Sequence, residues 1–187
     1  MAAVSMRVAA VSTTRPDRAG TELTPAPFPA PFPGCPGIVR PEWIDHNGHL
    51  NLAYYIVLFD AATDALWHAI GLGEPYRLRT GCGTFAVETH TLYLAELREG
   101  EDTRSRSFVV DLDAKRIHVA HDLLRARDGV VAARQELLYL TVNLQTRRSV
   151  PWPAETLVGL EAAADAHRDL RPDWVGRRVA IPPRRPA

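Results

Sequence analysis

The sequence predicts an α+β fold in which one long helix packs against a strongly twisted antiparallel sheet. Two observations support this fold class. Apolar side chains recur at steps of three and four between residues 52 and 73, which is the period of an amphipathic helix. Between residues 83 and 146 the chain instead has four runs rich in β-branched and aromatic residues, separated by short polar turns.

The first expected elements are a short strand and the long helix. The strand is expected at residues 37–43, where Pro41 places it at a sheet edge or a bulge. The helix follows Asn51, a favourable N-cap, and ends at Gly71 or Gly73. Residues 74–81 are then expected to form a loop that can include one helical turn.

Four long strands come next, at residues 83–97, 103–113, 116–127 and 130–146. Short turns join each strand to the following one, and the Asp-Gly pair at 128–129 favours a tight two-residue hairpin turn. Consecutive strands joined by such turns run antiparallel. A C-terminal amphipathic helix is expected at residues 154–170, after two prolines that end the last strand.

Composition predicts a single folded domain with extensions at both ends. The chain has 187 residues, of which 46% are hydrophobic and 24% charged, as in ordinary globular proteins. Residues 1–36, rich in Pro and Ala, are expected to form an extended or disordered tail. Residues 37–150 form the expected domain, and residues 151–187 supply a helix followed by a basic, Pro-rich tail.

Charge and cysteine content indicate which classes of partner and which cellular location to expect. Lys+Arg and Asp+Glu both number 22, which argues against a nucleic-acid partner bound through bulk positive charge. Two cysteines, Cys35 and Cys82, do not make a disulfide scaffold, so we expect a cytoplasmic setting. No apolar run approaches the roughly 20 residues of a membrane span. We therefore expect no membrane partner.

Residues 45–51, DHNGHLN, place polar and turn-forming groups directly before the long helix. Three interpretations stay open. In a plain turn, Gly48 permits the chain reversal and Asn51 caps the helix. As a metal site, Asp45 and the two histidines lack a further ligand at a recognisable spacing, so no metal is expected. In a catalytic site, the Asp45 carboxylate attacks or activates water, while free N–H groups of the helix hold the oxyanion.

The pattern Asp-x-x-Gly-His-x-Asn-x-x-Tyr-Tyr at 45–55, with the helix and four long strands behind it, resembles the hotdog-fold acyl-CoA thioesterases of the 4-hydroxybenzoyl-CoA type. The resemblance covers about residues 37–150. Further segments resemble one subgroup, the betainyl-CoA thioesterases of carnitine breakdown: EWIDHNGHLN, YRLRTGCGTFAVETHTLYLAEL, DLDAKRIHVAHDL and DLRPDWVGRRV. The family resemblance implies hydrolysis of a short acyl-CoA, and the subgroup resemblance implies that this acyl-CoA is betainyl-CoA. It implies no cofactor besides the CoA thioester substrate, and a homodimer or homotetramer formed through sheet edges.

The resemblance also implies roles for residues of the opening motif. Asp45 is the expected catalytic acid, either as a nucleophile or as a general base. The oxyanion donor is expected near the backbone N–H of Leu52, and Gly48 leaves room for the thioester. His49 and Asn51 are expected to order the turn.

Glu88 and His90 are the next candidates, because residues two apart on a strand face the same side of the sheet. Glu88 is expected to meet a cationic acyl group or to position water, and His90 to contact the substrate; simple solvent exposure is the alternative. A quaternary ammonium binds best to aromatic faces with a negative charge nearby. The aromatic candidates for the substrate pocket are Trp43, Tyr55, Phe59, Tyr76 and Tyr93.

Four basic residues around the second long strand and its turn are the candidates for binding the CoA phosphates: Arg104, Arg106, Lys115 and Arg116. A different hotdog plan uses an acid in the middle of the helix, where this chain offers Asp60 and Asp64. The acid at position 45 favours the first plan.

Two other functions stay open at this point. A hotdog hydratase or dehydratase would use Glu88 with His90, and a non-catalytic module would bind acyl-CoA without turnover. An α/β-hydrolase is disfavoured because the sequence has no Gly-x-Ser-x-Gly elbow.

Overall fold

The structure, a computed structural model, describes residues 27–181; residues 1–26 and 182–187, including most of the expected N-terminal tail, lie outside the described part. The strands are β1 (Phe32–Ile38), β2 (Cys82–Tyr93), β3 (Asp102–Leu112), β4 (Arg116–Arg125) and β5 (Val131–Asn143). The helices are α1 (Leu52–Ala69), α2 (Glu74–Thr80) and α3 (Ala154–His167), with single 3₁₀ turns at Pro41–Trp43 and Arg168–Leu170. The expected α+β fold class is confirmed.

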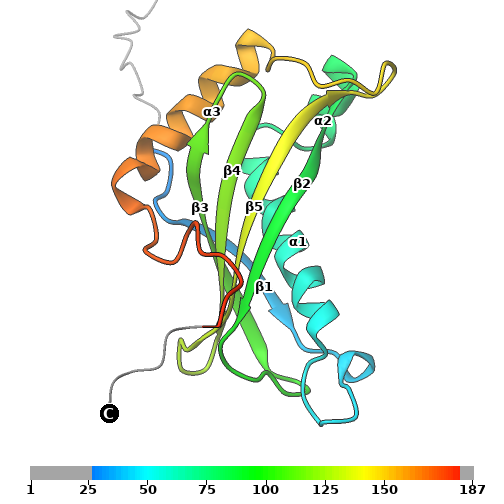
Figure 1. Ribbon diagram of the computed structural model, residues 1–187, viewed down its shortest axis with the longest axis vertical. Coiled ribbons are helices and arrows are strands. Elements are labelled where there is room, and N and C mark those ends of the chain that lie inside the picture. Colours follow the sequence, from blue (N-terminus) through cyan, green and yellow to red (C-terminus); the bar gives the residue numbers. More distant parts are fainter. Residues whose placement is uncertain (1–26, 182–187) are drawn as a thin grey trace, which may run out of the picture.

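All five strands form one antiparallel sheet in the order β1-β3-β4-β5-β2 (Figure 1). The strands β3, β4 and β5 form the expected meander, although the β4–β5 connection is a four-residue loop closed by Arg125 and Val130 rather than a two-residue turn. The expected hairpin between β2 and β3 is wrong, because β2 pairs with β5 at the far edge. The connection at 94–101 crosses the end of the sheet and buries Leu97 completely, so it does not close a turn.

The chain enters the sheet before Gly37, where we expected the folded part to begin. Strand β1 includes Pro33 and Pro36, so residues 32–36 are extended, as one of the two expected alternatives had it, but they belong to the sheet and not to a separate tail. Prolines are tolerated there because β1 is an edge strand, bulged between these two residues. The expected strand at 37–43 therefore ends early, and its last three residues form a 3₁₀ turn.

Helix α1 lies along one face of the sheet and builds the core with it (Figure 1). Leu66 and Trp67 of the helix pack in one buried cluster with Leu137 and Tyr139 of β5. Gly71, with φ of +80°, follows the helix as expected. Within residues 27–181, no single helix is long and apolar enough to cross a membrane; only α1 and α2 taken together, bent by 59°, meet the length and composition test.

Helix α2 occupies the segment expected to be a loop. Its side chain Tyr76 is almost fully buried, and the phenolic oxygen lies 3.1 Å from Thr141 Oγ1 of β5. Pro75 lies in the first turn, where proline is compatible with a helix. This tertiary anchor explains why the segment forms a helix of seven residues, where the sequence alone indicated a loop with at most one helical turn.

Helix α3 runs beside the part of β3 that β1 does not reach (Figure 1). His167 at its end replaces the missing strand, because its Nδ1 accepts a hydrogen bond from the Val109 N–H at 3.0 Å. The other ring nitrogen, Nε2, then carries the proton and donates to the Pro29 carbonyl at 3.0 Å. Burial lowers the pKa of His167 and keeps this imidazole neutral.

A second neutral histidine, His121, lies fully buried between the sheet and α1. Thr63 donates its hydroxyl proton to the Phe59 carbonyl at 3.1 Å, so its oxygen accepts from His121 Nε2–H at 3.2 Å. His121 Nδ1 in turn accepts from Ser107 Oγ–H at 2.8 Å. Both ring nitrogens are satisfied only in the neutral form, and burial lowers the pKa to about 3.

We predict that acid destabilises the fold through His121. The folded-state pKa of His121 lies below the unfolded value of 6.5. The contribution of the neutral imidazole to the free energy of unfolding is therefore complete above pH 6.5 and is lost as the pH falls toward 3. Between pH 7 and pH 5 the loss amounts to about 2 kcal/mol of unfolding free energy. The His121→Gln variant, measured by urea unfolding, should be less stable at pH 7 but lose less stability on going to pH 5. Exposed His46→Gln is the control, and an equal pH 5 loss in His121→Gln and wild type would contradict the prediction.

Candidate active site

The segment before α1 forms a tight loop. Ile44 and Leu50 pair as an isolated antiparallel bridge that closes it. Inside the loop, the Asp45 N–H donates to the His49 carbonyl and the Gly48 N–H donates to the Asp45 carbonyl, each at 3.0 Å. Gly48 has φ of +81°, in the left-handed region that glycine adopts without strain.

Two backbone hydrogen bonds fix this loop to the rest of the molecule. The Leu50 N–H donates to the carbonyl of Leu97, in the β2–β3 connection, at 2.7 Å. The Asn51 N–H donates to the Trp43 carbonyl at 2.9 Å. Both Leu50 and Leu97 are buried in one apolar cluster, so the loop and the connection are held face to face.

The Asp45 side chain is largely enclosed, with 16% of its surface exposed. Its Oδ1 accepts a hydrogen bond from the Asn47 backbone N–H at 2.8 Å and lies 3.9 Å from His49 Nδ1. The Asn47 N–H, followed by the charge of His49, lowers the pKa of Asp45 below its ordinary value, against the opposing effect of desolvation. The carboxylate is therefore ionised at neutral pH.

The first turn of α1 leaves one backbone donor free. Asn51 Oδ1 accepts from the Ala53 N–H at 3.0 Å, and the Asn51 carbonyl accepts from the Tyr54 N–H at 3.0 Å. The Leu52 N–H, which opens the helix, has no hydrogen-bond partner among residues 27–181. Because the partial positive charge of a helix concentrates at its N-terminus, this N–H can stabilise an oxyanion.

Asp45 and Leu52 line one cavity of about 460 Å³. Its walls come from the loop, the start of α1, the end of β2 and the β2–β3 connection. The lining residues are Asp45, Asn47, His49, Leu50, Leu52, Tyr55, Tyr93, Leu94, Ala95 and Glu96. The structure thus brings together five predicted site residues that come from three separate segments: Asp45, His49, Leu52, Tyr55 and Tyr93.

The two tyrosines form a fixed aromatic pair, with ring centroids 5.2 Å apart and planes at 79°. Tyr55 donates its hydroxyl to the Ala95 carbonyl at 3.2 Å, and Tyr93 donates to the Leu52 carbonyl at 3.4 Å. Desolvation raises the pKa of both phenols, so neither ionises at neutral pH. The cavity therefore combines an ionised acid, a free helix N–H and neutral aromatic faces.

Comparison with known proteins assigns this arrangement to a family. The model of the thioesterase-like superfamily matches residues 39–160. The chain belongs to that superfamily. It is 41% identical to a betainyl-CoA thioesterase from Pseudomonas aeruginosa, over 78% of this chain and 92% of that protein. It is also 35% identical to the L-carnitine dehydrogenase/betainyl-CoA thioesterase of Rhizobium meliloti, over 75% of this chain but 28% of that longer protein.

Solved structures agree on the fold. A Staphylococcus aureus protein in complex with CoA superposes with a TM-score of 0.74 at 27% identity, covering 84% of this chain and 100% of that one. A DHNA-CoA thioesterase from the same organism has a TM-score of 0.65 at 12% identity, covers 78% and 95%, and shows the fold alone. The expected hotdog fold is confirmed, and the protein is a thioester hydrolase.

Three of the predicted aromatic contacts lie elsewhere in this thioesterase. The structure contradicts the assignment of Phe59 and Tyr76, because both are buried in the core with at most 1% of their surface exposed. Trp43 stacks on Tyr54 at 5.3 Å and lines a separate cavity between β1 and α1. Aromatic residues at helical spacing therefore served mainly to build the core.

Glu88 and His90 face one side of the sheet, as expected, but not the side of Asp45. Leu137 and Tyr139 of β5 pack against α1, so the alternate residues Glu136 and Leu138 point away from it. Glu88 pairs with Leu138 and His90 with Glu136, and all four line a second cavity of about 320 Å³. Within one chain, the structure does not bring Glu88 or His90 to Asp45.

The four basic residues proposed for CoA do not form one cluster, which corrects that expectation. Arg104 and Arg106 lie near the start of β3, whereas Lys115 and Arg116 follow its end. At about 3.3 Å per residue, the two pairs are separated by roughly 30 Å along the strand. Arg106 pairs with nearly buried Asp122, and Arg116 with Asp113.

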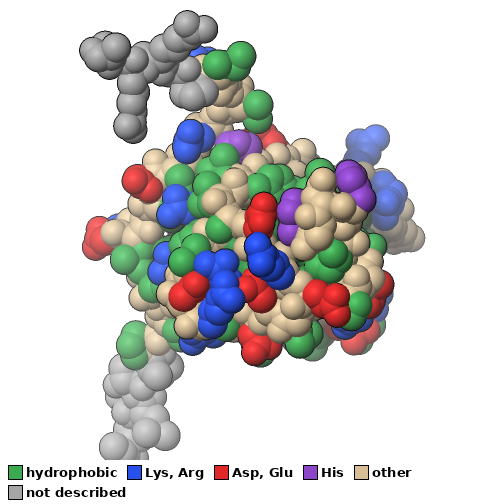
Figure 2. Space-filling model, turned by 90° about the horizontal axis from the view of Figure 1, so that it is seen from below, with side chains coloured by type: hydrophobic (Ala, Val, Ile, Leu, Met, Phe, Trp, Pro, Cys, Tyr) green, Lys and Arg blue, Asp and Glu red, His purple; other side chains and the backbone are tan. Residues whose placement is uncertain are grey.

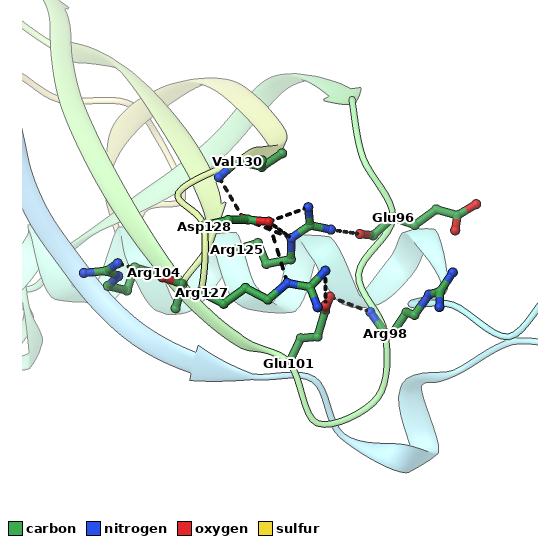
Figure 3. Close-up of polar contacts among 9 residues, drawn as sticks. Glu96, Arg98, Glu101, Arg104, Arg125, Arg127, Asp128 and Val130 are labelled. Atoms are coloured by element: carbon green, nitrogen blue, oxygen red, sulfur yellow. Dashed lines mark hydrogen bonds and ion pairs between the residues drawn. The ribbon is translucent and has the colours of Figure 1, made fainter.

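The end of the molecule that carries the Asp45 cavity has a different set of arginines, which the sequence did not single out. Figure 2 views the molecule from this end and shows basic and acidic side chains side by side. In Figure 3, Arg125 and Arg127 are bound to Asp128, and Arg127 also binds Glu101 at 3.0 Å. These contacts join the β2–β3 connection to the β4–β5 loop, a juxtaposition that no local pattern encodes.

Proposed function

We propose that this thioesterase hydrolyses betainyl-CoA to glycine betaine and CoA. The observation that carries the mechanism is the common cavity of the ionised Asp45 carboxylate and the unpaired Leu52 N–H. The substrate is supported by the Pseudomonas aeruginosa relative, most of whose length this chain spans. Small size and aromatic walls fit a short acyl group with a quaternary ammonium end.

In the proposed reaction, the thioester carbonyl oxygen binds at the Leu52 N–H. The Asp45 carboxylate either attacks the carbonyl carbon or takes a proton from the attacking water, so that a C–O bond forms. The N–H and the helix dipole stabilise the negative oxygen of the tetrahedral intermediate. The C–S bond then breaks, and the thiolate leaves readily because a thiol has a pKa of only about 8.5. Both routes require ionised Asp45.

The neighbouring residues act by positioning. Gly48 allows the left-handed turn that aims Asp45 into the cavity. His49 Nδ1 lies 3.9 Å from Asp45 Oδ1, close enough to help hold the carboxylate in place. Asn51 caps the Ala53 N–H and leaves the preceding Leu52 N–H for the substrate.

The competing functions have less support. A hydratase built on Glu88 and His90 would work on the face of the sheet away from α1 and Asp45. A binding module has no need of an ionised acid beside a free helix N–H. The cytoplasmic location, the absence of a metal and the absence of a cofactor stay predictions.

We predict that Asp45→Asn lowers kcat for betainyl-CoA by at least about a hundredfold, because the amide can neither attack nor take the proton. The measurement is release of CoA thiol followed with a chromogenic disulfide. The matched controls are Asp60→Asn and Asp64→Asn, which change exposed acids in the middle of α1. Retained activity in Asp45→Asn, with loss in either control, would favour the mid-helix plan instead.

For the CoA phosphates we propose Arg98 and Arg104. Both belong to the arginine-rich end that carries the Asp45 cavity (Figure 3), and neither side chain forms an ion pair within residues 27–181. Arg125 and Arg127, by contrast, are already neutralised by Asp128 and Glu101. A guanidinium without a carboxylate partner is free to bind phosphate.

We predict that removing either arginine weakens substrate binding and leaves the rate of the chemical step unchanged. Arg98→Ala and Arg104→Ala should each raise KM for the CoA thioester by about tenfold, since a charge-assisted hydrogen bond contributes about 1.5–3 kcal/mol. The value of kcat should be unchanged. Exposed Arg79→Ala, on α2, is the control. In steady-state kinetics on a truncated pantetheine thioester, neither variant should change KM. An equal rise in KM for that substrate would contradict phosphate binding by these arginines.

We further propose that two chains pair through β2. This strand of 12 residues lies at a sheet edge, and its middle residues, 86–89, are exposed. An exposed edge of this length is a template for strand pairing, and pairing of identical edges gives a two-fold dimer.

Val87→Pro should convert the dimer to a monomer. Val87 is the bulged residue with no Cα partner in β5, so proline there disturbs the free edge more than the β2–β5 ladder. Light scattering coupled to size-exclusion chromatography measures the mass, and Val87→Thr is the control that retains strand propensity. A wild-type enzyme that is fully active as a monomer would refute the pairing.

A further inference from the structure

The acyl group of betainyl-CoA is so short that its charge must lie in the cavity of Asp45. Only the methylene carbon separates the reacting carbonyl carbon from the quaternary nitrogen. Residues that recognise this cation must therefore line the cavity of about 460 Å³. Glu88, the sequence-based candidate for this role, lies on the opposite face of the sheet within one chain.

The charges that line this cavity favour a cation. Two carboxylates, Asp45 and Glu96, are among its lining residues, the imidazole of His49 is the one basic side chain there, and neither Lys nor Arg is present. Asp45 has a role in the chemistry, and its Oδ1 is bound by the Asn47 N–H. Glu96 has no such role, so its charge is left without an assigned function.

The Glu96 carboxylate forms no ion pair with the arginines at this end of the molecule, among residues 27–181. Arg125 binds both oxygens of Asp128 through Nε, at 3.1 and 3.0 Å, and its Nη1 donates to the Glu96 backbone carbonyl at 3.4 Å. Figure 3 shows the Glu96 side chain pointing away from this network. Within residues 27–181 its carboxylate forms no hydrogen bond or ion pair. Arg125 thus fixes the main chain of Glu96 and leaves the negative charge uncompensated.

Tyr93 supplies the aromatic surface beside this charge. It lies three residues before Glu96 and is 47% exposed, whereas its partner Tyr55 is buried behind it. The edge-to-face contact with Tyr55 and the hydroxyl bond to the Leu52 carbonyl fix the ring orientation. Because the ring is already ordered, binding a cation against it costs little side-chain entropy.

We propose that Glu96 and the ring of Tyr93 select the acyl group for its permanent positive charge. This rests on the proposed hydrolysis of betainyl-CoA. The Tyr93 ring attracts the cation through its quadrupole, and the Glu96 carboxylate attracts it through its charge. Neither contact depends on an N–H donor, which a trimethylammonium group lacks. A neutral acyl group of the same shape gains nothing from either.

The test compares two substrates that differ only in charge. Betainyl-CoA is paired with 3,3-dimethylbutanoyl-CoA, in which a carbon atom replaces the quaternary nitrogen. The measured quantity is the ratio of their kcat/KM values on one enzyme preparation. Partial misfolding of a variant lowers both values equally, so the ratio reports charge recognition alone.

In wild type the ratio should favour betainyl-CoA and fall with rising ionic strength, because salt screens the carboxylate. Glu96→Gln, which keeps shape and removes charge, should lower the ratio about tenfold. Exposed Glu99→Gln, in the same connection but outside the cavity lining, is the matched control. Tyr93→Leu should lower the ratio by about threefold to tenfold, while Tyr93→Phe, which keeps the ring, should preserve most of it.

The outcomes separate this inference from the proposed function. A wild-type enzyme that hydrolyses other acyl-CoA thioesters but not betainyl-CoA overturns the proposed function itself. A wild-type preference for betainyl-CoA that survives Glu96→Gln and Tyr93→Leu overturns only the recognition by these two residues. An equal fall of the ratio in Glu96→Gln and Glu99→Gln would show a general surface-charge effect and would also overturn it.

Discussion

The hydrogen bond from the Leu50 N–H to the Leu97 carbonyl, with both side chains buried around it, is the constraint on which the site depends. It joins the loop before α1 to the connection that leaves β2. The loop brings Asp45 and the free Leu52 N–H, and the connection brings the opposite cavity wall, with Tyr93 and Glu96 at its start. In the proposed mechanism neither half is a site alone, because the loop carries the reactive groups and the connection carries the surfaces proposed to contact the acyl group.

Local signals predicted the parts of the structure that local interactions determine. The long helix, its Asn51 cap and the turn at Gly48 were all predicted, because helix period, capping and turn formation act over a few residues. Non-local pairing was not readable. The placement of β2 beside β5, and the burial of Leu97 next to the segment that brings Glu96 to the cavity, both rest on contacts with residues far away in the sequence. The strand predicted from the sequence continued to residue 97, so the prediction did not show where the chain leaves the sheet.

The wrong assignments share a physical origin. Residue parity on a strand tells which side chains share a face, and Glu88 with His90 did share one. It does not tell which face meets the helix, so their distance from Asp45 was undetermined. Likewise, the spacing of Phe59 predicted an inward direction, and the core and a pocket both lie inward. Prolines at 33 and 36 excluded an inner strand, and β1 is indeed an edge strand, which accepts them; composition did not show that this extended segment would join the sheet.

The two edges of the sheet differ in a way that limits polymer growth. On one side, β1 carries two prolines and a bulge, and where β1 stops, His167 occupies the Val109 N–H that a further strand would use. That side therefore offers an incoming chain no regular ladder. Within residues 27–181, β2 is the edge strand without proline, although it too is bulged, at Val87. In the proposed pairing through β2, each copy uses up that edge, so strand addition there ends at a closed pair instead of extending into a fibre.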